Sequence, residues 1–476
     1  MSFSSLLFIF GFLPWFFLFY FSTPSRFKNY TALLGSALFY TWGAPRFLAV
    51  IVFTSICDYW FSKAIVNCVE GAKKRKLLLA FAVGLNLSIF FYFKYANFFV
   101  EQINAAIGAF GFSPWPWLEV ALPIGISFIT FEKISYLVDV YRGVTPPAKN
   151  LLSYALFLLL FPHLIAGPIF RYHDIQGQLL RRLHSVDLIF AGVLRFSVGL
   201  AKKVLIADPL GEVANNVFNL GDDRLSFYAV WIGISCYTFQ IFFDFSGYSD
   251  MAIGLGKIMG FKFVENFNHP YISQNITEFW RRWHISLSNW MKEYLYIPLG
   301  GNRLSTFRTY VNLWTVFLLS GLWHGANWTF IFWGAYHGFC LILDRLFWLK
   351  LSSKLPRVVN IAVTFFLVMI GWVFFRAENI SHATSFVKCL FSFSNIGLGF
   401  EATVAELFSS RSIAMFALAA ILSFLPASRV WQLFEEKEHL RWSTIVVRGQ
   451  LAFLIAILSV AFLVNSSFHP FIYFRF

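Results

Sequence analysis

Long apolar runs without charge are the feature that most restricts how this chain can fold. Residues 6–20 form one such run and residues 151–161 another. Only 13% of the 476 residues are charged and 58% are apolar, whereas a soluble domain carries about 25% charged residues. A helical span of a bilayer takes about 20 consecutive apolar residues. The sequence therefore predicts an all-α polytopic membrane protein and excludes a water-soluble globular domain.

The apolar runs give at most thirteen segments, and several are short or interrupted, so we expect about eleven transmembrane helices. Basic residues gather in short connections such as 73–76, which is typical of cytoplasmic loops. These loops account for the formal net charge of +14, so nucleic acid is not expected as a partner. Arg26 and Lys28 follow the first run, and Arg441 and Arg448 precede the last. This charge pattern predicts that both termini lie outside the cytoplasm.

The chain reads as a single domain over residues 1–476, with two unusual parts. In residues 244–308 apolar continuity gives way to Gly, Asp, Asn, Arg and Trp. Irregular backbone at membrane depth is tolerated only where it is buried in protein or lines a cavity. We therefore expect re-entrant helices around an internal chamber in this segment. Residues 466–476 form an aromatic tail, which the charge pattern places outside the cytoplasm.

A histidine between two glycines is the sharpest local signal. His324 lies between Gly321 and Gly325 within an apolar pair of predicted helices. Burial disfavours the charged form of an imidazole, so this side chain would be neutral near physiological pH and able to accept a proton as a general base. Asn327 follows three residues later, which on a continuous helix places it on the same face. Its amide could donate hydrogen bonds to a developing oxyanion. The alternative is a structural histidine bonded to a carbonyl group.

A second signal alternates cations with indoles. Arg281 and Arg282 can pair bidentately with phosphate, and Trp283 can stack on a purine, so a nucleotide-bearing donor such as coenzyme A would fit here. An interfacial aromatic belt with arginines on the cytoplasmic side is the alternative. His284 follows directly, and it is far enough from His324 in sequence for the two to converge from separate elements.

Two carboxylates near an apolar run carry a rival hypothesis. Asp244 and Asp250 could couple ion movement in a polytopic transporter or a lipid-carrier flippase, or they could bind cationic side chains in a structural network. The other histidines in apolar contexts, His163, His337 and His469, are read as core or interface residues. No metalloprotease, serine-hydrolase or P-loop motif is present, and no metal site or bound cofactor is expected.

Six motifs together resemble the membrane-bound O-acyltransferase superfamily, and within it the bacterial alginate O-acetyltransferases and related polysaccharide acetylases. The motifs are residues 122–128, 161–169, 244–250, 266–271, 279–287 and 322–328. The likeness covers almost the full length of the chain. It implies a helical bundle with a central tunnel, in which His324 is the catalytic histidine and His284 is the second signature histidine.

The resemblance also implies a reaction. Acetyl would come from cytoplasmic acetyl-CoA and cross the bacterial inner membrane through the tunnel to an acceptor on the outer face, with a periplasmic or cell-surface acetylase as partner. The tail resembles that of relatives in which a tyrosine is thought to accept the acyl group, so Tyr473 is either an acyl relay or an aromatic anchor. Alginate, cellulose, another exopolysaccharide, peptidoglycan and teichoic acid remain open as acceptors. The same fold acting on a lipid, sterol or protein hydroxyl is a further alternative.

Overall fold

The structure is a computed structural model that describes residues 1–393, 399–425, 442–465 and 471. Over these residues every regular element is a helix and none is a strand, which confirms the predicted all-α class. The chain divides into two compact units. Unit 1 comprises Met1–Ser185 with Met259–Phe263, and unit 2 comprises Val186–Ile258 with Val264–Phe476.

Unit 1 is built from helices of very different lengths. In chain order they are η1 (Leu7–Phe12), α1 (Leu13–Ser22), η2 (Ser25–Phe27), α2 (Lys28–Gly43), α3 (Pro45–Val66), α4 (Lys73–Ala109), α5 (Ile126–Arg142), α6 (Leu151–Leu159), α7 (Phe161–Leu164) and α8 (Tyr172–Leu180). A buried polar contact connects three of them. Asp58 on α3 accepts a hydrogen bond from Asn86 on α4 at 2.7 Å, and its carboxylate lies 3.4 Å from the ammonium group of Lys133 on α5. Pairing of this kind is what allows charged groups to be buried.

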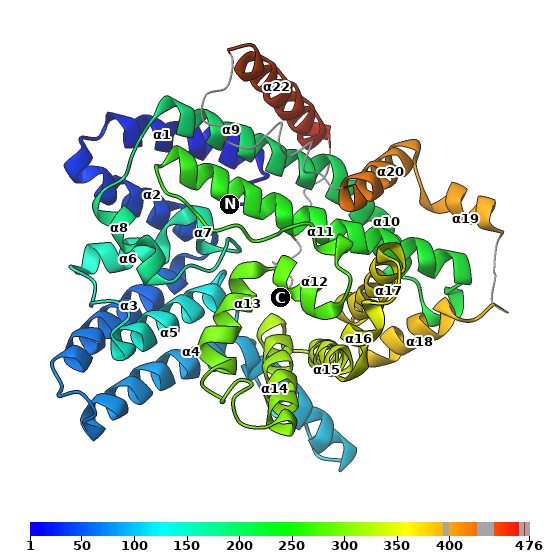
Figure 1. Cartoon of the computed structure of the whole chain (residues 1–476), viewed down its shortest axis with the longest axis horizontal. Helices are drawn as coiled ribbons and strands as arrows, with labels where there is room; N and C mark the ends of the chain where they lie inside the picture. Colours follow the sequence, from blue (N-terminus) through cyan, green and yellow to red (C-terminus); the bar gives the residue numbers. More distant parts are fainter. Residues whose placement is uncertain (394–398, 426–441, 466–470, 472–476) are drawn as a thin grey trace. The chain divides into compact units, whose positions relative to one another are not determined.

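Unit 2 holds the remaining described helices. They are α9 (Val186–Ala201), η3 (Lys202–Ala207), α10 (Asp208–Phe218), η4 (Asp222–Arg224), α11 (Phe227–Ile258), η5 (Pro270–Ile272), α12 (Ile276–Arg282), α13 (Ile285–Met291), η6 (Lys292–Tyr296), α14 (Thr306–His324), α15 (Trp328–Leu343), η7 (Asp344–Trp348), α16 (Leu349–Ser352), α17 (Arg357–Arg376), α18 (Ile380–Leu390), α19 (Phe400–Leu407), α20 (Ser410–Phe424) and α22 (Trp442–Asn465). Helices α9 and α11 run side by side (Figure 1). Their close approach requires a glycine at position 199, because a Cβ atom there would lie only 2.5 Å from the carbonyl oxygen of Gly247.

The segment 244–308 begins as regular helix. Residues from Asp244 to Ile258 continue α11, although their composition is no longer apolar. The irregular backbone starts after Ile258 and includes two seven-residue helices, α12 and α13. The re-entrant, cavity-lining character of this segment stays a prediction.

Five helices of the described chain are long and apolar enough to cross a membrane, or six if α19 and α20, which are bent by 102°, count as one span. The five spans are Pro45–Val66, Lys73–Ala109, Trp328–Ser352, Arg357–Arg376 and Val446–Asn465. Several other apolar runs fold as shorter pieces, as 151–170 does with the nine-residue α6 and the four-residue α7. The polytopic membrane character is thereby confirmed, and the number of about eleven spans stays a prediction.

Candidate active site

Helices α14 and α15 form an antiparallel pair that positions His324 at its end. A Cβ atom on Gly321 would lie 2.2 Å from the carbonyl oxygen of Phe330 and 3.2 Å from the Cα atom of Gly334. Only residues without a side chain allow such an approach. His324 is the last residue of α14, and Gly325 follows it in extended backbone.

The imidazole of His324 is enclosed by aromatic rings from three helices. Its side chain is buried, and its ring centroid lies 4.9 Å from Trp323 on α14, 5.0 Å from Trp333 on α15 and 5.2 Å from Phe375 on α17. Aromatic walls of this kind exclude water, which strengthens electrostatic interactions in the site. The structure therefore buries His324 among aromatic rings, and the burial agrees with the sequence prediction.

His284 joins α12 and α13 in a left-handed backbone conformation with φ of 45°. Its Nδ1 atom lies 3.1 Å from Oδ1 of Asn266. That oxygen also accepts hydrogen bonds from the backbone N–H and the hydroxyl group of Ser286, at 3.3 and 2.9 Å. Because Oδ1 can only accept, Nδ1 of His284 carries a hydrogen atom. In the neutral imidazole Nε2 is then the nitrogen with the lone pair.

Asn266 is a positioning residue to which the sequence reading gave no role. Its Nδ2 atom donates to the hydroxyl group of Ser249 on α11 at 3.2 Å, which fixes the orientation of the amide. One feature of the sequence that points to Asn266 is its place in the polar segment after an apolar helix. That position alone does not reveal which histidine the amide meets.

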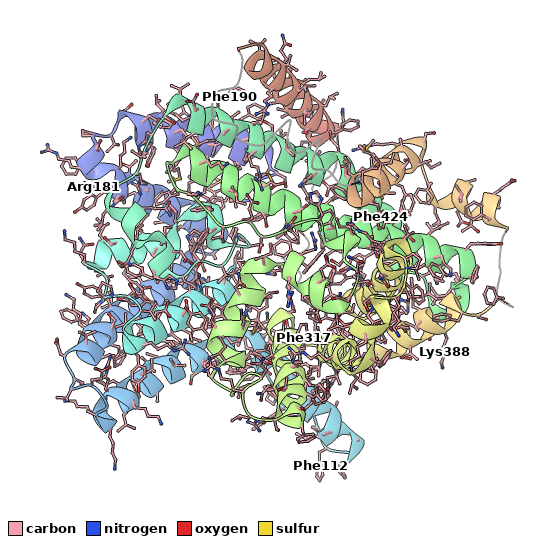
Figure 2. All side chains as sticks on the ribbon, viewed as in Figure 1. Phe112, Arg181, Phe190, Phe317, Lys388 and Phe424 are labelled. Carbon is pink, nitrogen blue, oxygen red and sulfur yellow. The ribbon has the colours of Figure 1, made fainter. Side chains whose placement is uncertain are left out.

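The two histidines converge on one indole. The ring centroid of Trp323 lies 4.9 Å from His324 and 6.4 Å from His284. Both imidazoles therefore contact the same indole, and their convergence on one reacting centre stays a prediction. Phe317 on α14, labelled in Figure 2, packs 5.2 Å from Trp280 on α12 and so connects the helix that precedes His284 with the helix that carries His324.

Asn327 does not share a helical face with His324, and the expectation that it would is wrong. The chain leaves the helix after His324, and Asn327 is the N-cap of α15. Its Oδ1 accepts from the backbone N–H of Thr329 at 3.0 Å, and its Nδ2 donates to the carbonyl oxygen of Glu378 at 2.9 Å. A role of this amide as an oxyanion donor stays a prediction.

The three residues predicted to bind the donor lie in different environments. Trp283 is buried, with its ring 4.9 Å from that of Trp372. Arg282 forms an ion pair with Glu278 at 2.8 Å, one helical turn earlier. Arg281 is exposed. Phosphate binding by the two arginines remains a prediction.

The carboxylates of α11 are paired with cations. Asp250 accepts hydrogen bonds from Nε of Arg195 at 2.7 Å and from Nζ of Lys202 at 2.6 Å. Asp244 lies 2.8 Å from Nζ of Lys203. This arrangement matches the structural network considered for the two residues. Among the described residues no three metal-ligating side chains gather at one place.

One residue of the tail, Phe471, is described by the structure, and it packs on α11. Phe471 is buried, and its ring stacks on that of Tyr248 at 4.5 Å between centroids. Phe245, one helical turn before Tyr248, lies 4.7 Å from the ring of His284. Tyr473 itself lies outside the described residues, as do most residues of the tail 466–476.

Comparison with known proteins identifies the family of this chain. The family model for membrane-bound O-acyltransferases matches residues 138–377. The chain is 44% identical to a probable alginate O-acetylase of Pseudomonas putida over 100% of both chains. It is 35% identical to a peptidoglycan O-acetyltransferase of Helicobacter pylori over 100% of this chain and 97% of that protein. It is 28% identical to a teichoic acid D-alanyltransferase of Bacillus subtilis over 56% of this chain and 74% of that protein. These matches confirm the resemblance carried by the motifs.

Proposed function

Because the chain belongs to the membrane-bound O-acyltransferase family, we propose that it transfers acetyl from cytoplasmic acetyl-CoA to hydroxyl groups of an extracytoplasmic polysaccharide. Acyltransferase activity at a membrane follows from the family itself. O-acetylation of a polysaccharide follows the relatives named for alginate and peptidoglycan. The observation that carries the proposal is the contact of both His284 and His324 with the indole of Trp323 among buried aromatic side chains.

In the proposed reaction His324 is the general base. The oxygen atom of an acceptor hydroxyl attacks the thioester carbonyl carbon, and His324 takes the hydroxyl proton. The intermediate then collapses, the carbon–sulfur bond breaks, and His324 returns the proton to the leaving thiolate, so that coenzyme A and an acetyl ester are the products. General-base catalysis of this kind increases the rate about 10²- to 10⁴-fold. His284 orients the attacking hydroxyl, because the hydrogen bond with Asn266 makes its Nε2 the accepting nitrogen.

Acetyl-CoA is proposed as the donor and not as a bound cofactor. Its phosphate groups are strong acceptors for guanidinium groups. Arg281 is exposed, and Arg282 is held in place by Glu278. We assign the phosphates to these two arginines, and stacking of the adenine on Trp283 stays a prediction because that indole is buried.

The tail supplies the proposed route to the acceptor. Phe471 packs against Tyr248 in the neighbourhood of His284, and Tyr473 follows two residues later in the chain. Tyr473 would accept the acetyl group as a phenyl ester and pass it to a periplasmic or cell-surface acetylase that modifies the polysaccharide. This route requires a location in the bacterial inner membrane with both termini outside the cytoplasm.

The test uses the purified full-length protein and acetyl-labelled coenzyme A. We expect wild-type protein to consume the thioester in the presence of the polysaccharide and its acetylase, and His324→Ala to abolish consumption while the protein stays folded. His184→Ala, which changes an exposed histidine of unit 1, is the matched control. Label that appears on wild-type protein and is lost in Tyr473→Phe supports the relay.

A failure of wild-type protein to consume acetyl-CoA under these conditions would overturn the proposal. It would return attention to the transporter or flippase hypothesis, which predicts movement of substrate that depends on Asp244 and not on acetyl-CoA. Consumption that persists in His324→Ala would remove the general-base assignment and leave the family membership intact.

A further inference from the structure

His337 on α15 is a buried histidine that the proposed mechanism does not use. Its exposed fraction is 0%, and neither of its ring nitrogens has a hydrogen-bond partner within the described parts of the chain. Buried polar groups are nearly always hydrogen-bonded, because burial without a partner costs free energy. The ring nitrogens of His337 are therefore available to form a hydrogen bond with a bound ligand.

Two indoles that contact the imidazole of His337 also have N–H groups without a hydrogen-bond partner in the described residues. The ring centroids of Trp280 and Trp333 each lie 5.1 Å from that of His337, at interplanar angles of 90° and 70°. Both indoles are buried, and neither indole N–H has an acceptor among the residues that the structure describes. We call His337, Trp280 and Trp333 the His337 cage.

The surroundings of His337 indicate which nitrogen carries its hydrogen atom. A Cβ atom on Gly371 of α17 would lie 2.5 Å from Nε2. The Cα–H group of Gly371 therefore faces this nitrogen, and such a group can interact with a lone pair but cannot accept a hydrogen bond. The hydrogen atom then belongs on Nδ1, which leaves Nδ1–H as the donor of His337 toward a guest.

The His337 cage adjoins the candidate base. Trp333 contacts both histidines, with its ring centroid 5.0 Å from His324 and 5.1 Å from His337. We propose that the His337 cage binds the carbonyl oxygen of a short acyl thioester beside His324, with Nδ1–H of His337 and the indole N–H groups as hydrogen-bond donors. This inference rests on the proposed function and deepens it, because it assigns the acyl subsite of the same reaction.

The chemistry of the cage fits a neutral oxygen acceptor that becomes negative during the reaction. Its three side chains offer ring N–H donors, which suit an oxygen acceptor, and its aromatic faces suit a methyl group. When the hydroxyl attacks, the carbonyl electrons move to the oxygen atom. His337 then stabilises the oxyanion through its hydrogen bond and keeps its own proton. Loss of one such donor lowers kcat by about 10²- to 10³-fold.

The experiment follows the carbonyl group directly. Full-length protein in lipid nanodiscs is given a ketone analogue of acetyl-CoA, in which a methylene group separates sulfur from a carbonyl carbon labelled with ¹³C. Isotope-edited infrared spectra report the stretching frequency of the bound carbonyl, which falls when hydrogen bonds to it strengthen. Acetyl transfer from authentic acetyl-CoA is measured in parallel as kcat and KM.

We expect His337→Phe to raise the carbonyl frequency and to lower kcat by about 10²-fold, with KM for acetyl-CoA little changed. His337→Gln, whose amide can still donate, should recover part of both effects. Tyr336→Phe is the matched control, because the neighbouring Tyr336 hydroxyl donates to the carbonyl oxygen of Leu367 at 2.8 Å and is not part of the cage. It should leave the band and kcat unchanged.

An unchanged band and an unchanged kcat in His337→Phe would overturn the inference and leave the proposed function standing. If wild-type protein transfers no acetyl, the proposed function fails, whereas the band of the bound analogue still tests the contact with His337. If His337→Phe does not fold, Trp280→Phe decides, because it removes one donor and keeps an aromatic ring. The band must rise in that variant too, and a band at the wild-type position refutes the subsite.

Discussion

Gly321 and Gly334 bring the backbones of α14 and α15 into contact, since a Cβ atom on Gly321 would lie 3.2 Å from the Cα atom of Gly334. His324 follows Gly321 by three residues and His337 follows Gly334 by three. The glycine contact therefore fixes how the two buried histidines stand around Trp333. A change in the separation of these helices would move the candidate base relative to the rest of the pocket.

Gly321→Ala should destabilise the protein and slow acetyl transfer. The added methyl group would meet the carbonyl oxygen of Phe330 at 2.2 Å, and overpacking of this kind costs about 1 to 3 kcal/mol. Thermal unfolding in detergent and acetyl-CoA turnover measure the two effects. Gly84→Ala is the control, because a Cβ atom on that helical glycine meets nothing within 4 Å. Equal melting temperatures for Gly321→Ala and Gly84→Ala would contradict the close-contact account.

Asn266→Ala should lower kcat without unfolding the protein. The variant removes the acceptor that holds Nδ1–H of His284 at 3.1 Å, so the imidazole can adopt the other tautomer and turn its lone pair away. The attacking hydroxyl is then no longer oriented by His284, and a misplacement of this kind costs up to about 10²-fold in rate. Asn289→Ala, at an exposed position of α13, should behave as wild type. A normal pH–rate profile and normal kcat in Asn266→Ala would remove Asn266 from the site.

Asp250→Asn should cause a large loss of stability. The substitution removes the counter-charge that Asp250 holds 2.6 Å from Lys202, and it leaves Arg195 with Glu265 as a remaining partner. Breaking a buried ion pair by removing one partner typically costs about 3 to 5 kcal/mol. Unfolding in denaturant measures the loss, with Asp187→Asn at an exposed position of α9 as the matched control. A transporter role without a structural role predicts instead that Asp250→Asn keeps wild-type stability.

The stability contributed by Asp222 should depend on pH. Its carboxylate accepts hydrogen bonds from Nδ1 of His382 at 2.6 Å and from the hydroxyl group of Ser385 at 2.8 Å, and these bonds lower the pKa of Asp222. A pKa that is lower in the folded than in the unfolded protein stabilises the fold at pH values above the unfolded pKa of about 3.9. The contribution disappears as the pH falls through the folded value.

The measurement compares wild type with Asp222→Asn at pH 7 and at successively lower pH. The variant should unfold at a lower temperature near pH 7, and the gap should narrow as the pH falls below about 4. Ser385→Ala, which removes one of the two donors, should show the same trend with a smaller gap. A gap of constant size over this range would show that the carboxylate does not act through its charge.

The sequence by itself determined the class of the protein and predicted His324 as its candidate base. Long apolar runs specify membrane helices because the transfer of side chains into lipid depends on composition over about 20 residues, which is a local property. His324 could be recognised because a titratable residue between glycines in an apolar stretch is costly without a role. The ion pair of Arg282 with Glu278 is also a local feature, because residues four apart on a helix are neighbours.

Tertiary structure alone decided which of these residues meet. The contact of His284 with Trp323 depends on a left-handed residue between two short helices, and the role of Asn266 depends on the return of the chain from α11. His337 was read as an ordinary core histidine, and only packing showed that its nitrogens and two indoles lack partners in the described chain. Because α14 ends at His324, Asn327 is the N-cap residue of the next helix. Such contacts depend on the packing of elements far apart in sequence, which local patterns of polarity do not specify.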